Sequence, residues 1–225
     1  MRESLLRADA ASPGAPRRHR NLGVRLVDYA DQVAVRCHRC GTPGWVLAQW
    51  EPYRWQARFR CGQCSAALDS AADDWVGMVQ LVGRRACGHC GHQWVHVCAA
   101  SAAAVPPPKT LPGRCASCRK DCAVAVQPRR VRDGSPHDPH FGMPLALVAP
   151  TRAGLLWAYN PRHLQELQDY VSATLRERRG LFGRSMVARL PAWMKLARHR
   201  PLMLRALQRL QQASAQLPSV PAAAT

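Results

Sequence analysis

The sequence predicts a small α+β protein, with two β-rich modules in tandem followed by a C-terminal helical region. Three observations lead to this prediction. Eight of the ten cysteines form four Cys-x-x-Cys pairs. The pairs recur, because Cys37 and Cys87 are 50 positions apart and Cys61 and Cys115 are 54 apart. The last third of the chain repeats apolar residues at helical spacing.

The paired cysteines predict two structural zinc ions per chain. A Cys-x-x-Cys turn, or knuckle, places two sulfurs on one side of a tight bend, and two knuckles complete a tetrahedral site. Sequential pairing leaves loops of 20 and 24 residues, typical of zinc ribbons, while interleaved pairing, as in cross-brace domains, remains open. The predicted ligands are Cys37, Cys40, Cys61 and Cys64 for one Zn²⁺, and Cys87, Cys90, Cys115 and Cys118 for the other.

We interpret both zinc sites as structural. A catalytic zinc keeps one position open, usually beside an acid or base, whereas sulfur here can fill all four positions. A thioredoxin-like role requires a Cys-x-x-Cys pair at a helix start in a βαβ unit, and the sequence indicates no such unit. Cys98 and Cys122 are left over. We expect both to be small buried hydrophobes, with substitution as a ligand left open.

Changes in composition divide the chain into six segments. Pro13, Gly14 and Pro16 interrupt any regular element near the N-terminus. A stretch containing proline, glycine and histidine follows the last cysteine. The predicted segments are a disordered basic tail (1–20), a first zinc ribbon (21–70), a second zinc ribbon (71–130), a linker with a short strand (131–160), a helical region (161–215) and a flexible tail (216–225).

The first ribbon should consist of short strands, over residues 22–35 and 45–50 and above all over 53–60, where polar and apolar residues alternate strictly. Alternation places successive side chains on opposite faces of a sheet. The apolar face carries Tyr53, Trp55, Ala57 and Phe59, and the other face carries Arg54, Gln56, Arg58 and Arg60. In the second ribbon, residues 99–108 are rich in alanine and then proline, which predicts a loop.

The C-terminal third should be an independent helical unit, preceded by a strand over residues 145–148. Asn160 and Pro161 supply an N-cap and a first-turn proline. Two shorter helices are expected over residues 185–197, bent or restarted at Pro191, and 201–211. The stripe of the first helix consists of Leu164, Leu167, Val171 and Leu175.

Composition limits the class of protein. Of 225 residues, 47% are hydrophobic but only 6% are aromatic, which suits several small modules better than one large core. No apolar run reaches the ~18–20 residues of a membrane span. Residues 1–20 hold five arginines but lack an apolar stretch of signal-peptide length. We therefore expect a cytoplasmic protein without a membrane partner.

Several segments carry a resemblance to a known group. They are residues 141–145 (FGMPL), 156–164 (LWAYNPRHL) and 190–195 (LPAWMK), followed by a closing helix over 204–210. Together with the four knuckles, they resemble a group of uncharacterised bacterial zinc-ribbon proteins over roughly residues 30–212, with Trp-Ala-Tyr-Asn as the most specific part. The chain departs from that group at His199-Arg200-Pro201, where a polar cap residue is expected. The resemblance implies a small accessory protein and no catalytic residues.

The charge predicts a polyanionic partner. The formal net charge is +18, and about +14 remains after two sites of four thiolates each bind Zn²⁺. Solubility alone requires only ~2–8 charges. We therefore expect a non-catalytic protein that binds nucleic acid, DNA or RNA, through its phosphates. The candidate contacts are Arg54, Arg58, Arg60, Arg178, Arg179, Arg184, Arg189, Lys195, Arg198 and Arg200.

Two alternatives remain open. A protein–protein adaptor, or a scaffold subunit of a larger bacterial complex, would use Trp157, Tyr159 and Trp193 as exposed anchors. A metal-dependent nuclease would need clustered acidic residues, yet Asp73 and Asp74 form the only adjacent acidic pair. The sequence indicates no small-molecule substrate. Salt separates the first two functions, because phosphate binding weakens steeply with ionic strength and apolar docking does not.

Overall fold

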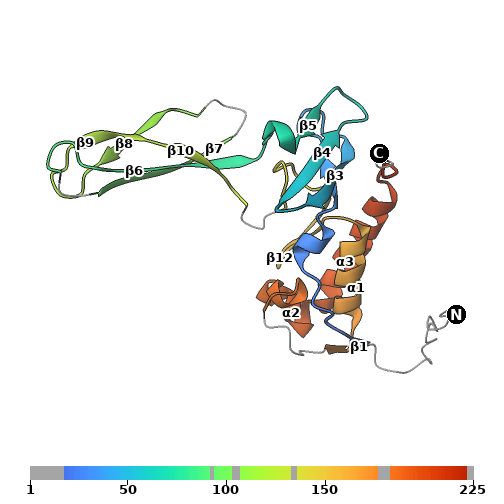
Figure 1. Ribbon diagram of the computed structural model, residues 1–225. Helices are drawn as coiled ribbons and strands as arrows, with labels where there is room; N and C mark the ends of the chain where they lie inside the picture. The colour runs from blue at the N-terminus through green and yellow to red at the C-terminus, as the bar shows by residue number, and fades with distance from the viewer. Residues whose placement is uncertain (1–17, 92–93, 103–106, 133–135, 177–182, 222–225) are drawn as a thin grey trace, which may run out of the picture.

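The computed structural model describes residues 18–91, 94–102, 107–132, 136–176 and 183–221. It confirms the α+β class, with β-rich regions around the cysteines and helices near the C-terminus. Figure 1 shows an arm, made of β6 to β10, that projects from a body made of the other elements. Within the described residues, none of the helices has the length and apolar character needed to cross a membrane.

The strands are β1 (Arg18–His19), β2 (Gln32–Arg36), β3 (Pro43–Glu51), β4 (Arg54–Arg60), β5 (Ala67–Asp69), β6 (Met78–Ala86), β7 (Trp94–Ala102), β8 (Thr110–Arg114), β9 (Asp121–Ala125), β10 (Gln127–Arg130), β11 (Leu147–Thr151), β12 (Gly154–Ala158) and β13 (Leu175–Arg176). The helices are α1 (Pro161–Ser172), α2 (Ala192–Lys195) and α3 (Arg200–Ala215). Short 3₁₀ turns are η1 (Leu26–Tyr29), η2 (Ser70–Ala72), η3 (Val187–Arg189) and η4 (Ala197–His199).

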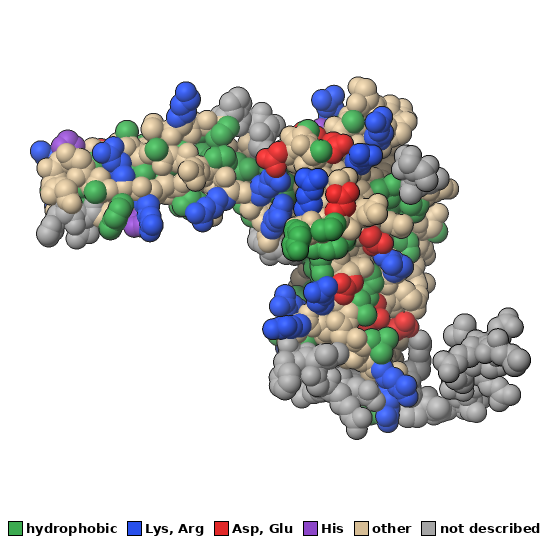
Figure 2. Space-filling model, viewed as in Figure 1, with side chains coloured by type: hydrophobic (Ala, Val, Ile, Leu, Met, Phe, Trp, Pro, Cys, Tyr) green, Lys and Arg blue, Asp and Glu red, His purple; other side chains and the backbone are tan. Residues whose placement is uncertain are grey.

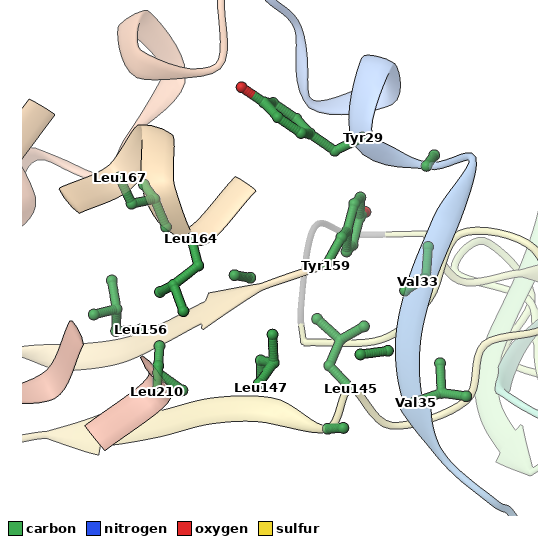
Figure 3. Packing of buried hydrophobic residues seen from close by; sticks show 14 of the residues in the cluster. Tyr29, Val33, Val35, Leu145, Leu147, Leu156, Tyr159, Leu164, Leu167 and Leu210 are labelled. Carbon is green, nitrogen blue, oxygen red and sulfur yellow. The ribbon is translucent and has the colours of Figure 1, made fainter. Parts of the chain in front are cut away.

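The body has one continuous core that joins the first ribbon to the helices. Antiparallel β2, β3, β4 and β5 form its main sheet, in that order, and β11 and β12 form a second hairpin. Helix α3 packs against α1 and β11. Figure 3 shows Val33 and Val35 of β2 in the same cluster as Leu164 and Leu167 of α1. The C-terminal helices therefore do not form an independent packing unit.

Asn160 ties these parts together, and its side chain is only 1% exposed. Its Oδ1 accepts a hydrogen bond from the His163 amide at 2.9 Å, the N-cap bond that the sequence predicts. Its Nδ2 donates to the carbonyl oxygens of Tyr29 at 2.9 Å and Gln32 at 2.7 Å. One side chain thus caps α1 and also holds the turn that enters β2.

Several predicted elements need correction. The helix expected over residues 185–197 is replaced by η3, α2 and η4, because Pro191 has no amide hydrogen for a helical bond and Leu190 before it is extended (ψ 142°). The last helix is longer than expected and begins at Arg200 without a side-chain cap. The strand expected over 145–148 corresponds to β11, which begins at Leu147. Its partner β12 lies within the segment predicted as a linker, where only one short strand was expected.

The chain ends also differ from expectation. Arg18 and His19 of the predicted tail pair in parallel with β13, whereas residues 1–17 lie outside the described part. Residues 22–35 contain η1 before β2. In the segment expected to be flexible after residue 215, the Pro218 carbonyl accepts a hydrogen bond from Trp45 Nε1 at 2.8 Å. The end of α3 is thereby connected to the first ribbon.

The arm carries the second ribbon and has little core of its own. Strands β10, β6 and β7 form one sheet, and β8 pairs with β9. The long pairing of β6 with β7 runs to Ala102, so the first part of the expected 99–108 loop is strand. Gly83 permits β9 to approach, because a Cβ there would lie 2.2 Å from the Ala125 carbonyl oxygen. The six buried residues of this cluster are Cys87, Val95, Val97, Cys115, Cys122 and Val124.

Candidate metal centres and a basic groove

The first centre joins the β2–β3 knuckle to the β4–β5 knuckle. The Sγ atoms of Cys37 and Cys64 are 3.7 Å apart, and those of Cys40 and Cys61 are 3.5 Å apart. All four sulfurs lie within 4.8 Å of one another. Cys37 is buried and Cys40 is exposed, so the cluster lies at the edge of the body core.

The second centre repeats this arrangement with the β6–β7 and β8–β9 knuckles. The Sγ atoms of Cys87 and Cys118 are 3.5 Å apart, and those of Cys90 and Cys115 are 3.9 Å apart. These four sulfurs also lie within 4.8 Å of one another. The structure thus brings together all eight predicted ligands and confirms sequential pairing. Interleaved pairing is wrong.

Both clusters fit a tetrahedral metal ion. Zinc–sulfur bonds of about 2.3 Å at tetrahedral angles place the sulfurs about 3.8 Å apart, close to the four distances above. Three knuckles end on a residue in the left-handed conformation: Gly41 (φ 74°), Gly91 (φ 63°) and Arg119 (φ 61°). Each amide there donates to the carbonyl of the first cysteine of its knuckle, at 2.8–2.9 Å. This turn directs the two sulfurs of a knuckle toward one point.

The knuckle amides favour ionised sulfur. Cys61 Sγ accepts hydrogen bonds from the amides of Gln63 and Cys64, each at 3.4 Å, and these bonds lower the pKa of Cys61. The amides of Cys90 and His89 likewise lower the pKa of Cys87 to about 5. The Lys120 amide lowers the pKa of Cys118, but burial and the neighbouring thiols raise it to about 12. Four adjacent thiolates repel one another, so a cation bound at their centre would be needed to keep all four ionised.

The two remaining cysteines differ from each other. Cys122 is buried, as expected, and its Sγ lies 3.8 Å from that of Cys87. It nevertheless stands outside the group of four mutually close sulfurs. Cys98 is exposed on β7, so the expectation that it is buried is wrong. Strand β7 pairs on one side only, with β6, and Cys98 belongs to its outward-facing set.

A groove with a volume of about 1160 Å³ is lined mainly by the body. Its lining comes from the turn end of the β3–β4 hairpin, from β12, from segment 184–194 and from the end of β10, where the arm meets the body. Figure 2 shows Lys and Arg side chains beside a hydrophobic patch near the junction of arm and body. Among the described residues, the lining contains no Asp or Glu. Its six arginines are Arg25, Arg54, Arg130, Arg132, Arg184 and Arg189.

Histidines form part of the groove floor and are held neutral by burial. His140 Nε2 lies 2.7 Å from the Ala30 carbonyl oxygen and therefore carries the proton. His163 Nδ1 accepts a hydrogen bond from the Tyr159 amide at 3.1 Å, and burial lowers the pKa of His163 to about 3. Both rings thus serve the fold, and neither is poised as an acid or base near neutral pH.

The predicted basic contacts divide into groups. Arg54, Arg184 and Arg189 line the groove, whereas Lys195 and Arg198 are exposed elsewhere. Arg58 and Arg60 lie on the outer face of β4, and Arg58 Nε is 3.3 Å from Asp69 Oδ2. Arg200 is half-buried and donates to the Ala173 carbonyl at 2.7 Å, so its guanidinium serves the fold. Arg178 and Arg179 lie outside the described residues.

Half of the groove's arginines were not among the predicted contacts. Arg25 lies near the start of the first predicted ribbon, Arg130 ends the second and Arg132 begins the linker, so all three are far in sequence from the C-terminal cluster. The run Arg129-Arg130-Val131-Arg132 was the available signal. The apolar face of β4 also differs at one end, because Tyr53 lies in the hairpin turn and is 97% exposed.

The aromatic residues expected to anchor a protein partner are mostly packed. Tyr159 is buried, and Trp157 and Trp193 are half-buried. Exposed aromatic rings are found instead at Trp50, Tyr53 and Trp94. Comparisons with protein-family models, with curated proteins and with solved structures gave no match to this chain.

Proposed function

We propose that this protein is a non-catalytic zinc-ribbon protein that binds nucleic acid through its phosphates. Each four-thiol cluster would hold one Zn²⁺ and so fix two knuckles in place. Thiolate ligands favour zinc over calcium or magnesium, which prefer oxygen. With four sulfurs available, neither ion needs an open position for substrate.

The groove lined by arginine is the observation that carries this proposal. Six guanidinium groups surround it, and the described lining contains no carboxylate. The chain as a whole has a formal net charge of +18, which attracts polyanions over long range. A metal-dependent nuclease would need carboxylates at such a place, so the lining favours binding over phosphate cleavage.

Three of these arginines are more available than the others. Arg25, Arg54 and Arg130 each pair with a nearby carboxylate, at 3.0, 3.8 and 2.6 Å. Within the described part of the chain, Arg132, Arg184 and Arg189 lack an acidic partner at ion-pair distance. Phosphates that these three neutralise would release condensed counterions, and binding would weaken with salt.

The test compares two triple variants with the same change in charge. Arg132→Ala/Arg184→Ala/Arg189→Ala removes groove arginines. Arg58→Ala/Arg60→Ala/Arg198→Ala removes exposed arginines that do not line the groove. Affinity for nucleic acid is measured by fluorescence anisotropy at several salt concentrations. We expect the groove variant to flatten the plot of log affinity against log salt by about 2–3, at 0.7–0.9 per lost contact.

The control variant should change that slope much less. An equal effect of the two variants would contradict the groove as the binding site. Absence of binding by the unmodified protein at low salt would contradict nucleic-acid binding itself.

A protein-interaction adaptor is the second candidate, and Trp94 favours it. This ring is 63% exposed at the start of β7 in the arm, with the Arg84 guanidinium 5.6 Å from its centroid. An exposed tryptophan at the end of a projecting arm is a common anchor for a protein partner. Binding that persists at high salt and is lost in Trp94→Ala would identify this role.

A further inference from the structure

We infer that the groove binds unpaired nucleotides, with Trp50 and Tyr53 as stacking surfaces for bases. This inference rests on the proposed function and specifies which form of nucleic acid the groove accepts. Aromatic rings next to arginines are the combination by which proteins hold single strands, because every base has a face that can stack. In a duplex these faces are covered by neighbouring bases.

The β3–β4 hairpin supplies a firm base for one ring. Trp50 and Trp55 are cross-strand partners, with ring centroids 5.3 Å apart in an edge-to-face arrangement. Trp55 is half-buried, and its ring lies 5.4 Å from the buried ring of His140. Trp50 is 58% exposed on top of this support. A supported but exposed indole can accept a base without a large loss of side-chain entropy.

Tyr53 occupies a strained position beside it. The hairpin turn contains Pro52 and Tyr53, and Tyr53 has a φ of 73°. With proline before it, this is the third position of a type II turn, where glycine or asparagine is preferred. A bulky side chain in the left-handed region costs stability. The ring gains nothing from packing in return, because it is 97% exposed.

Residues from β12 and from the C-terminal segment complete a surface suited to bases and phosphates. Leu155 and Trp157 of β12 line it, and Leu155 is 41% exposed. Arg54 follows Tyr53 in the same hairpin, and the Arg184 and Arg189 side chains border the groove from the C-terminal segment. The guanidinium groups of the hairpin and of the C-terminal segment offer cations for the phosphates that flank a bound base. An acidic peptide would use the charges but would have no need of the aromatic rings.

The experiment uses the full-length, zinc-loaded protein and two labelled probes. One is a single-stranded oligothymidylate of about 16 nucleotides, and the other is its duplex with oligoadenylate. The variants are Trp50→Ala and Tyr53→Gly. Trp94→Ala is the matched control, because that tryptophan is similarly exposed but lies in the arm. Trp50→Leu keeps apolar area but removes the aromatic ring. It therefore distinguishes the loss of stacking from a general loss of hairpin structure.

We expect the unmodified protein to prefer the single strand. Trp50→Ala and Trp50→Leu should each weaken single-strand binding by about 5- to 100-fold, the range that one stacked base provides. Duplex binding and its salt slope should stay unchanged, as should both affinities of Trp94→Ala. Tyr53→Gly should weaken single-strand binding while raising the thermal midpoint by about 2–4 °C, because the strain is relieved. A merely structural role for Tyr53 would not give these opposite changes.

Other outcomes would overturn the inference. If both probes bind with equal affinity and the Trp50 variants have no effect, base stacking is contradicted, while phosphate binding by the groove still holds. Equal losses in Trp94→Ala would place the stacking surface in the arm. If polyglutamate binds as tightly as the single strand, and the Trp50 variants lose this binding, the partner of the groove is an acidic protein. If neither probe binds at low salt, the proposed function fails as well.

Discussion

The two metal centres have the same four ligands but very different surroundings. The first lies at the edge of a core that extends from Val33 in β2 to Leu210 in α3. The second lies in the arm, where three valines and three cysteines make up the buried cluster. A cluster that small offsets little of the entropy lost on folding, so we expect the arm to depend on a metal ion at its four cysteines.

This difference shows that one local motif can serve two purposes. In the arm, we expect metal binding to supply most of the folding free energy, as in small zinc modules. In the body, a metal ion would join the ends of a sheet that already has extensive apolar contacts. Variants and pH changes that affect only one of the two centres separate these cases.

Removing the second metal should unfold the arm alone. Cys115→Ser/Cys118→Ser deletes two of its four ligands, and apparent zinc-binding free energies in such modules are about 10–16 kcal/mol. Elemental analysis should find one zinc per chain in place of two. Limited proteolysis should cut the arm, while the helical circular dichroism of the body persists. Cys98→Ser, which removes an exposed thiol outside both clusters, should retain both ions. Loss of the helical signal along with the second zinc would show that the body needs the arm.

A cavity in the helical core should weaken the first metal centre and spare the second. Leu207 in α3 is 1% exposed, and Leu→Ala at such a site costs about 2–5 kcal/mol. Because the first ribbon shares this core, Leu207→Ala should speed release of one zinc to a chelator, followed with a colorimetric dye. The other zinc should leave at the unmodified rate. If the variant releases both ions at the unmodified rates, the helical region is an independent unit, as the sequence predicted.

Acid should destabilise the body through His163. Its pKa in the folded state is about 3, below the unfolded value of about 6.5, so the unfolded chain binds the extra proton. Stability is therefore complete above about pH 6.5 and falls with pH toward 3, by about 2 kcal/mol at pH 5. Denaturant unfolding, followed by helical circular dichroism at pH 7 and 5, measures this loss. His163→Gln should remove this part of the pH dependence. An identical pH dependence in the variant would contradict the role of His163 and assign the loss to other groups, such as buried His140 or the cysteine thiolates.

The smallest effect concerns two knuckle turns that end on a left-handed residue, one in each centre. Arg119 is exposed at φ 61° after the second knuckle of the arm, whereas Gly41 follows the first knuckle of the body at φ 74°. Arg119→Gly should stabilise the arm by about 1 kcal/mol, and Gly41→Ala should destabilise the body by about the same amount. Chelator titration of each zinc provides the measurement. If Arg119→Gly weakens retention of the second ion, then the Arg119 side chain contributes more than strain.

Local patterns predicted much of what the structure contains. The eight ligands followed from Cys-x-x-Cys spacing, and the start of α1 followed from Asn160 and Pro161, because both depend on neighbouring residues. Prediction failed where a local pattern had more than one solution. Apolar spacing over 185–197 suggested a helix that Pro191 breaks. The strand expected over 53–60 begins one residue later, at Arg54, because Tyr53 belongs to the turn.

The sequence alone was enough to predict the four Cys-x-x-Cys pairs, the strand leading to Cys61, the capped start of α1 and the strong positive charge. These depend on residue spacing, on short-range geometry and on composition, all of which can be read along the chain. Tertiary packing was needed to establish which pairs come together, and that the first ribbon shares its core with the helices while the second lies in an arm. It also decided that Arg25, Arg132 and Arg184 meet at one groove. Contacts of this kind depend on packing between segments that are far apart in the chain, and a local sequence pattern does not indicate which segments pack together.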